Sequence, residues 1–341
     1  MANQPITRAI QVITSHDELV SGEVKRVIKI VKQNRRGSTL ADIFCNNRCK
    51  DLQILVFSIV GKTRGGKSLL LNLMIKYLES QPGTPDWLTG TVSPHTGFTW
   101  EGGVSSVTRG IWIWPRIYRR VAANGAEVGI LLVDNEGMFD GEATDGEILA
   151  MSGLSTVISY IQMFNVKDKI TTDYLECIVR NLVRGIEDME NVQGDRVRED
   201  YKLMFLVRDW IYEDYHSFGL DEGWNYIEAD SQRGTTEHRA IWQEIRRTFN
   251  DIQCVLLPYP GTAVNSTQFT STGQLSNLDE PFLREVKNFI RNLFASENLR
   301  PPETKLTGQG IYDLLMSVDG KVADDSLSFL NLTSFFYHPI V

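Results

Sequence analysis

A glycine-rich turn that ends in a lysine and a serine carries the clearest chemical signal in this chain. Its residues fit the phosphate-binding pattern G-x-x-x-x-G-K-[ST] and read Gly61-Lys62-Thr63-Arg64-Gly65-Gly66-Lys67-Ser68. Glycines allow the backbone to curl so that successive N–H groups face a polyphosphate. We expect Lys67 to reach the β- and γ-phosphates of a nucleotide and the Ser68 hydroxyl to bind Mg²⁺. The amides expected around the phosphates belong to Lys62, Thr63, Arg64, Gly65, Gly66, Lys67, Ser68 and Leu69.

The segments on either side of this turn are those that a phosphate-binding loop requires. Residues 54–60 are apolar and rich in β-branched side chains, which predicts a buried strand. Residues 69–78 predict a helix, whose first turn adds partial positive charge near the phosphates. The alternative is a glycine-rich turn that matches the pattern by chance, and the strand and helix around it argue against that alternative.

A second strand-like run, at residues 128–133, ends in Asp134-Asn135-Glu136-Gly137. The carboxylate of Asp134 could hold magnesium through water, and the backbone N–H of Gly137 could sense a γ-phosphate. Glu136 is a candidate for organising an attacking water. Asp-x-x-Gly is a weak motif alone, but its place at a strand end downstream of a phosphate loop predicts a nucleotide switch.

A threonine between these two motifs is a further candidate ligand. Thr108 lies in the segment Val107-Thr108-Arg109-Gly110-Ile111-Trp112-Ile113-Trp114, and the alternating run after Thr108 predicts a strand. In that position its hydroxyl could bind magnesium and its N–H the γ-phosphate, as long as the triphosphate is intact. Ser105 and Ser106 are the competing candidates, and a plain strand-start threonine is the structural alternative.

A third strand-like run, at residues 203–207, is followed by Arg208 and Asp209. A carboxylate at this point could accept hydrogen bonds from N1–H and the 2-amino group of guanine, a donor pair that adenine lacks. Arg208 could lay its guanidinium plane against the base. An ion pair on the protein surface would give the same Arg-Asp sequence. The sequence lacks the Asn-Lys-x-Asp motif with which small GTPases recognise guanine. Asp209 is therefore the candidate base reader by position.

The order of these elements predicts an α/β fold with a mostly parallel central sheet flanked by helices on both faces. Ligands of such sheets bind beyond the carboxyl ends of the strands. A fourth strand is expected at residues 252–257 and an edge strand at 5–13. Helices are expected at residues 21–32, 147–164, 174–192 and 281–294.

Composition narrows the function classes. The chain has 341 residues, 42% hydrophobic and 23% charged, as in ordinary globular proteins. A formal net charge of −8 argues against broad nucleic-acid binding. Four scattered cysteines predict neither a disulfide framework nor a zinc site. We find no signal peptide and no apolar run long enough to span a bilayer, and we expect a cytoplasmic protein.

Together these motifs resemble those of the dynamin-like GTPases of the atlastin and guanylate-binding-protein group, and atlastins in particular. The resemblance covers roughly residues 12–299. Its most particular parts are Arg64 in the loop, Thr108-Arg109-Gly110-Ile111, residues 134–140, residues 205–210 and residues 256–261. It implies a P-loop GTPase with a large G domain that converts GTP to GDP and phosphate with Mg²⁺, and that forms a homodimer through its nucleotide face. It also implies that Arg64 acts as an arginine finger from the same subunit.

Atlastins tether and fuse endoplasmic reticulum tubules with a three-helix middle domain, two membrane spans and an amphipathic tail. The resemblance therefore implies a place at the cytosolic face of the endoplasmic reticulum. We expect a GTPase domain at residues 1–299 and, at 300–341, a linker and a short apolar segment, without middle domain or spans. Residues 326–341 could dock on a partner or a membrane, or pack on their own domain. Asn135 stands where the family usually has threonine. The alternative function is a slowly hydrolysing GTP-binding switch that dimerises and tethers without fusing membranes by itself.

Overall fold

The structure is a computed structural model that describes residues 7–33, 39–62, 65–81, 83–93, 95–99, 110–136, 145–187, 200–321 and 336–337. Residues 136, 145, 267, 336 and 337 are described in their backbone only.

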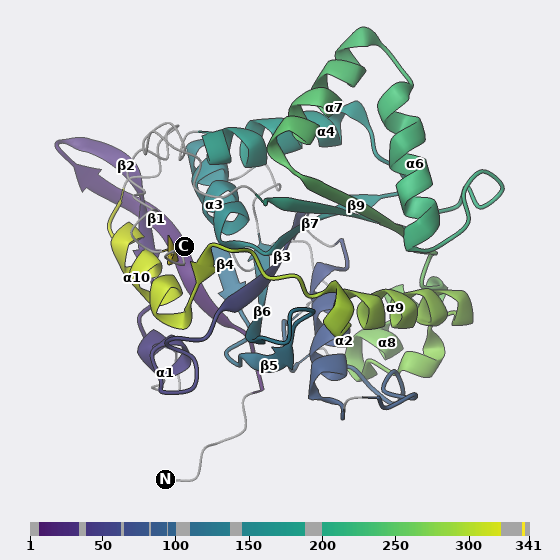
Figure 1. Ribbon diagram of the computed structural model, residues 1–341, viewed down its shortest axis with the longest axis horizontal. Coiled ribbons are helices and arrows are strands. Elements are labelled where there is room, and N and C mark those ends of the chain that lie inside the picture. Colours follow the sequence, from purple (N-terminus) through teal and green to yellow (C-terminus); the bar gives the residue numbers. More distant parts are fainter. Residues whose placement is uncertain are drawn as a thin grey trace.

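Among these residues, nine strands form one mixed sheet (Figure 1). From one edge to the other its main path runs β2 (Glu23–Ile30), β1 (Ile10–Val20), β4 (Gly110–Ile113), β6 (Glu127–Glu136), β3 (Ile54–Gly61), β7 (Ile161–Lys167), β8 (Lys202–Arg208) and β9 (Asp251–Leu256), and β5 (Tyr118–Val121) pairs with β6. The five strands from β6 to β9 are parallel. Because these strands run in the same direction, the carboxyl ends of β6, β3, β7 and β8 meet at one edge of the sheet. The remaining pairs are antiparallel.

The central strands are apolar on both faces because helices cover both. In β3, Val56 and Val60 join the buried cluster on one face, whereas Leu55, Phe57 and Ile59 join the cluster on the other. The first face is covered by α1 (Leu40–Phe44), α3 (Asp145–Ile158), α4 (Thr172–Ile178), α6 (Leu220–Gln232), α7 (Thr236–Thr248) and α10 (Gly308–Val318). The second is covered by α2 (Lys67–Glu79), α8 (Thr267–Thr272) and α9 (Glu280–Leu293).

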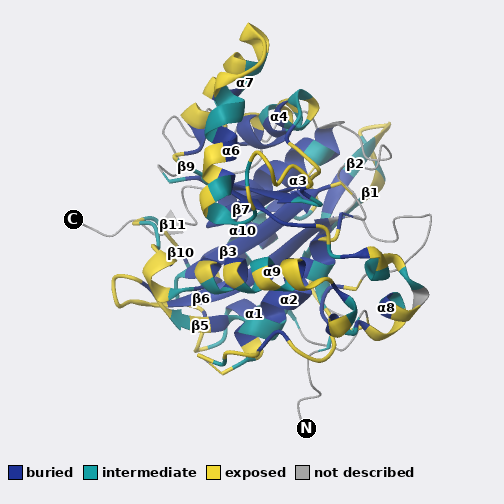
Figure 2. Ribbon diagram, turned by 90° about the vertical axis from the view of Figure 1, so that its right-hand side faces the viewer, coloured by how far each residue is buried: buried dark blue, intermediate teal, exposed yellow. Residues whose placement is uncertain are grey.

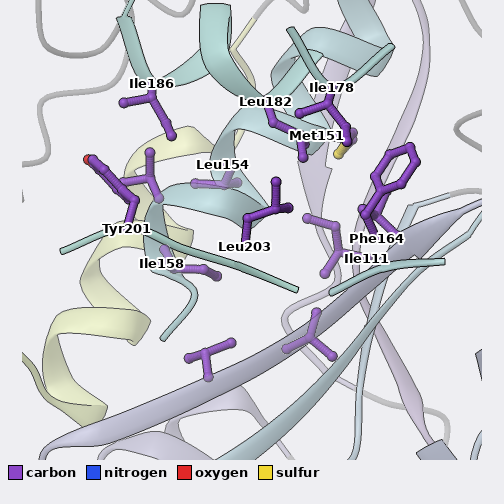
Figure 3. Close-up of a cluster of buried hydrophobic side chains, with 14 of the residues drawn as sticks. Ile111, Met151, Leu154, Ile158, Phe164, Ile178, Leu182, Ile186, Tyr201 and Leu203 are labelled. Carbon is purple, nitrogen blue, oxygen red and sulfur yellow. The ribbon is translucent and has the colours of Figure 1, made fainter. Parts of the chain in front are cut away.

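The cores on the two faces are continuous layers of aliphatic and aromatic side chains. Figure 2 shows the strands buried at the centre and the outer surfaces of α7 and α9 exposed. On the first face α4 continues into a π-helical turn at Val179–Val183, which packs against α3. Figure 3 shows that packing, with Met151, Leu154 and Ile158 of α3 beside Ile178, Leu182 and Leu203. Short 3₁₀ turns lie at Thr262–Asn265, Leu275–Asn277 and Ser296–Asn298.

The predicted α/β class, with its parallel central strands and two covered faces, is confirmed. The strands expected at residues 54–60, 128–133, 203–207 and 252–257 correspond to β3, β6, β8 and β9. The helix expected at residues 281–294 corresponds to α9.

Two predicted helices are wrong in part or whole. The helix expected at residues 147–164 ends at Ile158, and the following residues form β7 in the middle of the sheet. The helix expected at residues 21–32 is instead strand β2, which pairs with β1 in a hairpin. The strand expected at residues 5–13 overlaps β1, which begins at Ile10, but its predicted edge position is wrong because β2 forms that edge of the sheet. The turn residues Ser21 and Gly22 have φ of 53° and 86°, which suits a tight hairpin turn.

Residues beyond 299 pack on the same body. In α10, Ile311, Leu314 and Val318 are buried in the cluster of the first face. The chain after α10 pairs with the edge strand β2: the Ile28 N–H donates to the Lys321 carbonyl at 2.7 Å, and the Gly320 N–H donates to the Ile28 carbonyl at 2.8 Å. β10 (Lys305–Leu306) pairs with β11 (Phe336–Tyr337), and the rest of the apolar segment at 326–341 lies outside the described residues. No helix in the described parts of the chain is long and apolar enough to cross a bilayer.

Candidate active site

The predicted phosphate loop connects the end of β3 to the start of α2. Gly66 directly precedes α2 in the left-handed conformation, with φ 75°, and none of the described side chains caps the helix. A glycine at the N-cap position offers no side chain to the amides of the first turn of α2, and helix starts of this kind are common anion sites. A Cβ at Gly65 would lie 2.3 Å from Nδ2 of Asn165 and 2.9 Å from the Lys62 carbonyl, so only glycine fits. Thr63 and Arg64 lie outside the described residues.

Three of the predicted side chains meet at the start of α2. The Lys67 ammonium donates to the carbonyls of Gly61 at 2.9 Å and Lys62 at 3.1 Å. Ser68 Oγ donates to Asp134 Oδ2 at 3.0 Å. The structure therefore brings together Lys67, Ser68 and Asp134, which lie on two separate motifs of the sequence.

Asp134 is a carboxylate in a dry environment. It is 1% exposed, and burial raises the pKa of Asp134 above its ordinary value, an effect that the Lys67 ammonium and the Ser68 hydroxyl partly offset. Its second oxygen, Oδ1, is buried without a hydrogen-bond partner among the described residues. A buried, unpartnered carboxylate oxygen beside a serine hydroxyl suits Mg²⁺, which prefers hard oxygen ligands and takes few of them from the protein. The donor set present therefore fits magnesium.

The remaining predicted switch residues are described incompletely. Thr108 and Gly137 lie outside the described residues. Glu136 ends β6, where it is paired with Gly110 of β4, and only its backbone is described. The backbone thus carries Glu136 to the end of the strand that holds Asp134, two residues farther along.

A cleft of about 310 Å³ extends from the start of α2 to the predicted base-reading residues. Its size lies within the range of small-molecule sites. Leu69 and Leu70 line it on the side of α2, and Arg208 and Asp209 line it at the end of β8. The other lining residues are Gly66, Asn165, Lys167, Leu206, Leu257, Tyr259, Pro260, Val264, Asn265 and Phe282.

The two predicted base-reading residues are held in a defined arrangement. Arg208 Nη1 donates to Asp209 Oδ2 at 2.9 Å, and Arg208 Nε donates to Asn165 Oδ1 at 3.1 Å. Asp209 has φ 59°, a left-handed conformation that few residues other than glycine adopt. Such outliers concentrate at functional sites, which is consistent with a role for this carboxylate in the cleft.

Sequence reasoning missed the part of the cleft that β7 and the residues after β9 supply. The sequence predicts a helix over residues 147–164, so it does not indicate that Asn165 and Lys167 lie at the carboxyl end of a strand. Tyr259 and Pro260 belong to a segment that carries the family resemblance, but no role was assigned to them. The signal that could have found them is their position just after a strand of a parallel sheet.

Asn135 faces away from the phosphate loop. Successive residues of a strand point to opposite faces, so Asp134 contacts α2 while Asn135 points toward α3. The Asn135 amide donates to Ser58 Oγ at 2.9 Å and to Ser155 Oγ at 2.7 Å in a buried polar layer. Asn135 therefore lies within the core of the first face.

Comparison with known proteins identifies a family. The family described as "Guanylate-binding protein, N-terminal domain" matches residues 38–301. The range includes the phosphate loop, β6 with Asp134, and the whole cleft.

Individual relatives agree with this match. The chain is 35% identical to Atlastin-2 of Macaca fascicularis over 263 residues, which cover 76% of this chain and 46% of the relative. It is 31% identical to Atlastin-2 of Xenopus laevis over 312 residues, covering 90% and 52%. It is 31% identical to Atlastin-3 of Homo sapiens over 282 residues, covering 80% and 51%. The chain thus spans about half the length of the curated relatives it matches.

Proposed function

This chain belongs to the atlastin and guanylate-binding-protein family of large GTPases, and from that premise we propose that it hydrolyses GTP to GDP and phosphate with Mg²⁺. The observation that carries the proposal is the buried contact of Ser68 with Asp134 beside Lys67, at the start of a helix without a side-chain cap. The cleft that continues from this point to Asp209 gives room for a base.

Each residue has a role that follows from its chemistry. Lys67, which contacts loop carbonyls here, would turn to the β- and γ-phosphates when a nucleotide arrives. Ser68, Asp134 and Thr108 would hold Mg²⁺, which supplies positive charge to the phosphate oxygens when it is bound.

Other residues would orient the attacking water and neutralise the charge of the transition state. Glu136 would orient the attacking water, and Gly137 would contact the γ-phosphate through its N–H. Arg64 would neutralise charge that develops during transfer, as the family resemblance implies.

Guanine recognition is proposed for Asp209. Its carboxylate would accept the N1–H and the 2-amino group, with Arg208 against the base. The test is displacement of a fluorescent guanosine nucleotide by unlabelled GTP or ATP. We expect GTP to compete at least tenfold better than ATP, and Asp209→Asn to remove that difference. Equal competition by ATP in the parent protein would overturn the guanine assignment.

Hydrolysis itself is tested by phosphate release with and without Mg²⁺. Lys67→Ala should abolish turnover, while Lys76→Ala, the same change near the other end of α2, should leave it close to that of the parent protein. If the parent protein binds no guanine or adenine nucleotide in the presence of Mg²⁺, the proposal fails.

We further propose that the GTP-bound chain forms a homodimer and, within a longer protein, acts at the endoplasmic reticulum membrane. Family membership supports this proposal. A mass measurement in GDP and in GDP with aluminium fluoride, which mimics the transition state, tests the dimer. A doubling of mass only with the mimic is expected, and a monomer in both states would contradict dimerisation.

A further inference from the structure

Asn165 is a buried amide that lies between the two ends of the proposed nucleotide site. It is 4% exposed at the carboxyl end of β7, and β7 lies between β3 and β8 in the sheet. Its backbone is paired with Gly61 of β3 on one side and with Leu206 of β8 on the other. This position lets one side chain reach both the phosphate loop and the base-reading pair.

Both polar atoms of the Asn165 amide are used. Nδ2 donates to the Gly65 carbonyl of the phosphate loop at 2.9 Å. Oδ1 accepts from Arg208 Nε at 3.1 Å, and Arg208 Nη1 donates in turn to Asp209 Oδ2 at 2.9 Å. A continuous chain of hydrogen bonds therefore joins the loop to the carboxylate that would read guanine.

Other features make this connection hard to replace. A Cβ at Gly65 would lie 2.3 Å from Asn165 Nδ2, so the loop and the amide are packed with no spare room. Asn165 also lines the cleft itself, between the side of α2 and Arg208. The Gly65 carbonyl requires a donor and Arg208 Nε requires an acceptor at this position. Among side chains of this length, only asparagine provides both.

We propose that Asn165 is a positioning residue that holds the phosphate loop and the Arg208–Asp209 pair in register, so that guanine selectivity depends on it. The proposal rests on the function proposed above. Asn165 acts through two hydrogen bonds, which we call its two arms. The arm to Arg208 orients the base-reading carboxylate, and the arm to the Gly65 carbonyl fixes the loop for the phosphates.

The two arms can be separated by substitution. Asn165→Leu keeps the approximate volume and removes both arms. Asn165→Asp is isosteric, keeps an acceptor for Arg208, and sets an oxygen against the Gly65 carbonyl. Asn181→Leu and Asn181→Asp are matched controls, because Asn181 is also buried but its amide contacts Cys177 Sγ on α4, away from the cleft.

The decisive readout is the ratio of the Kd for inosine diphosphate to the Kd for guanosine diphosphate. Inosine lacks the 2-amino group, so the ratio reports the Asp209 carboxylate and is insensitive to a general loss of stability. We expect Asn165→Leu to reduce this ratio by about tenfold, which is the effect of one hydrogen bond to a charged group. Combining Asn165→Leu with Arg208→Met should reduce the ratio no further than Arg208→Met alone, because both break the same arm.

Asn165→Asp tests the loop arm, and it keeps the proposal testable if Asn165→Leu does not fold. It should weaken binding of both diphosphates by about tenfold or more relative to Asn181→Asp, while the inosine-to-guanosine ratio stays closer to that of the parent protein. Unchanged ratios in Asn165→Leu, or unchanged affinities in Asn165→Asp, would overturn the inference while GTP binding by the parent protein stands. Absence of any nucleotide binding by the parent protein would instead overturn the proposed function, and this inference with it.

Discussion

Asp134 is a carboxylate whose environment disfavours its own charge. It is almost fully buried, and Oδ1 has no hydrogen-bond partner within the described part of the chain. Burial raises the pKa of Asp134 above its ordinary value of 3.8, with Lys67 and Ser68 opposing the shift. A divalent ion at this oxygen would favour the ionised form, so metal binding and the charge of Asp134 are coupled.

Replacement of Asp134 by asparagine should therefore stabilise the nucleotide-free protein while abolishing Mg²⁺-dependent nucleotide binding. A raised pKa in the folded state means that, at pH values between the unfolded and the folded pKa, the folded chain keeps the Asp134 proton and the unfolded chain has lost it. The resulting stability is present at low pH and is lost as the pH rises through the folded pKa.

The difference in Tm between Asp134→Asn and the parent protein should accordingly be larger at pH 8 than at pH 5. We expect a gain on the order of 1 kcal/mol at pH 8, or about 2 °C in Tm. Thermal unfolding at both pH values measures it. Asp51→Asn, whose side chain is 85% exposed, is the control and should show no such difference. Destabilisation by Asp134→Asn at pH 8 would contradict the argument.

Arg64 is proposed to act only on the transition state. Arg64→Ala should therefore lower kcat by about 10³-fold or more and change the Kd for GTP little, because a guanidinium at this place meets charge that develops during transfer. Single-turnover hydrolysis with a separate binding measurement distinguishes the two effects. Arg48→Ala changes an exposed arginine in the turn after α1, and this control variant should hydrolyse GTP at the parent rate. Unaltered hydrolysis by Arg64→Ala would contradict the proposed role of Arg64 and would favour the alternative function, a GTP-binding switch that hydrolyses GTP slowly.

At the scale of elements, a buried polar layer joins four of them. Asn135 of β6 donates to Ser58 of β3 and Ser155 of α3, and Gln162 of β7 accepts from Ser155 at 3.2 Å. All four side chains are essentially inaccessible to water. Such layers fix the register of the elements that they join, since an unmatched polar group in a core is costly.

Asn135→Ala should therefore cost about 2–4 kcal/mol in the free energy of unfolding, from two lost hydrogen bonds and a small cavity. Chemical denaturation measures this loss. Asn225→Ala, at an exposed position of α6, loses only a surface contact with Glu222 and should stay within about 0.5 kcal/mol of the parent protein. A loss of equal size in both variants would show that the layer does not stabilise the fold.

Apolar strands with clear boundaries in the sequence could be predicted. Strands whose boundaries are not marked in the sequence, and which are recognised only by their pairing in the sheet, could not. β3, β6, β8 and β9 are predominantly apolar runs bounded by polar or glycine residues, as buried parallel strands are. β7 directly follows the apolar helix α3, with only Ser159 and Tyr160 between them, so no change of period separates the two. The β1–β2 hairpin was missed because its Ser21-Gly22 turn was not recognised.

The same distinction applies to the site. Lys67, Ser68, Asp134 and Asp209 lie in local motifs and could be proposed as site residues one by one. Asn165 could not, because the role proposed for it depends on the position of β7 between β3 and β8. That position is a property of the sheet order, which local patterns do not encode.

At the scale of the whole molecule, α10 packs against the same body as the central sheet. Its apolar face enters the first-face core, and α10 contacts both α1 and β2. The residues after it pair with the backbone of β2 and place the Asp319 carboxylate 2.8 Å from the Lys32 ammonium. These contacts cover the end of the edge strand β2 at Ile28 and Ile30, where unpaired backbone groups would invite association.

If α10 is an integral part of this body, then Leu314→Ala should destabilise all of it. Leu314 is fully buried, and truncation of such a leucine costs about 2–5 kcal/mol through lost burial and a residual cavity. Leu19→Ala makes the same change at a site that is 74% exposed and should cost under about 0.5 kcal/mol. Denaturant unfolding, followed by tryptophan fluorescence, should give a single transition that moves to lower denaturant in Leu314→Ala only. A parent-like midpoint in that variant would mean that α10 is an appendage, because loss of its packing would then leave the two cores of the sheet untouched.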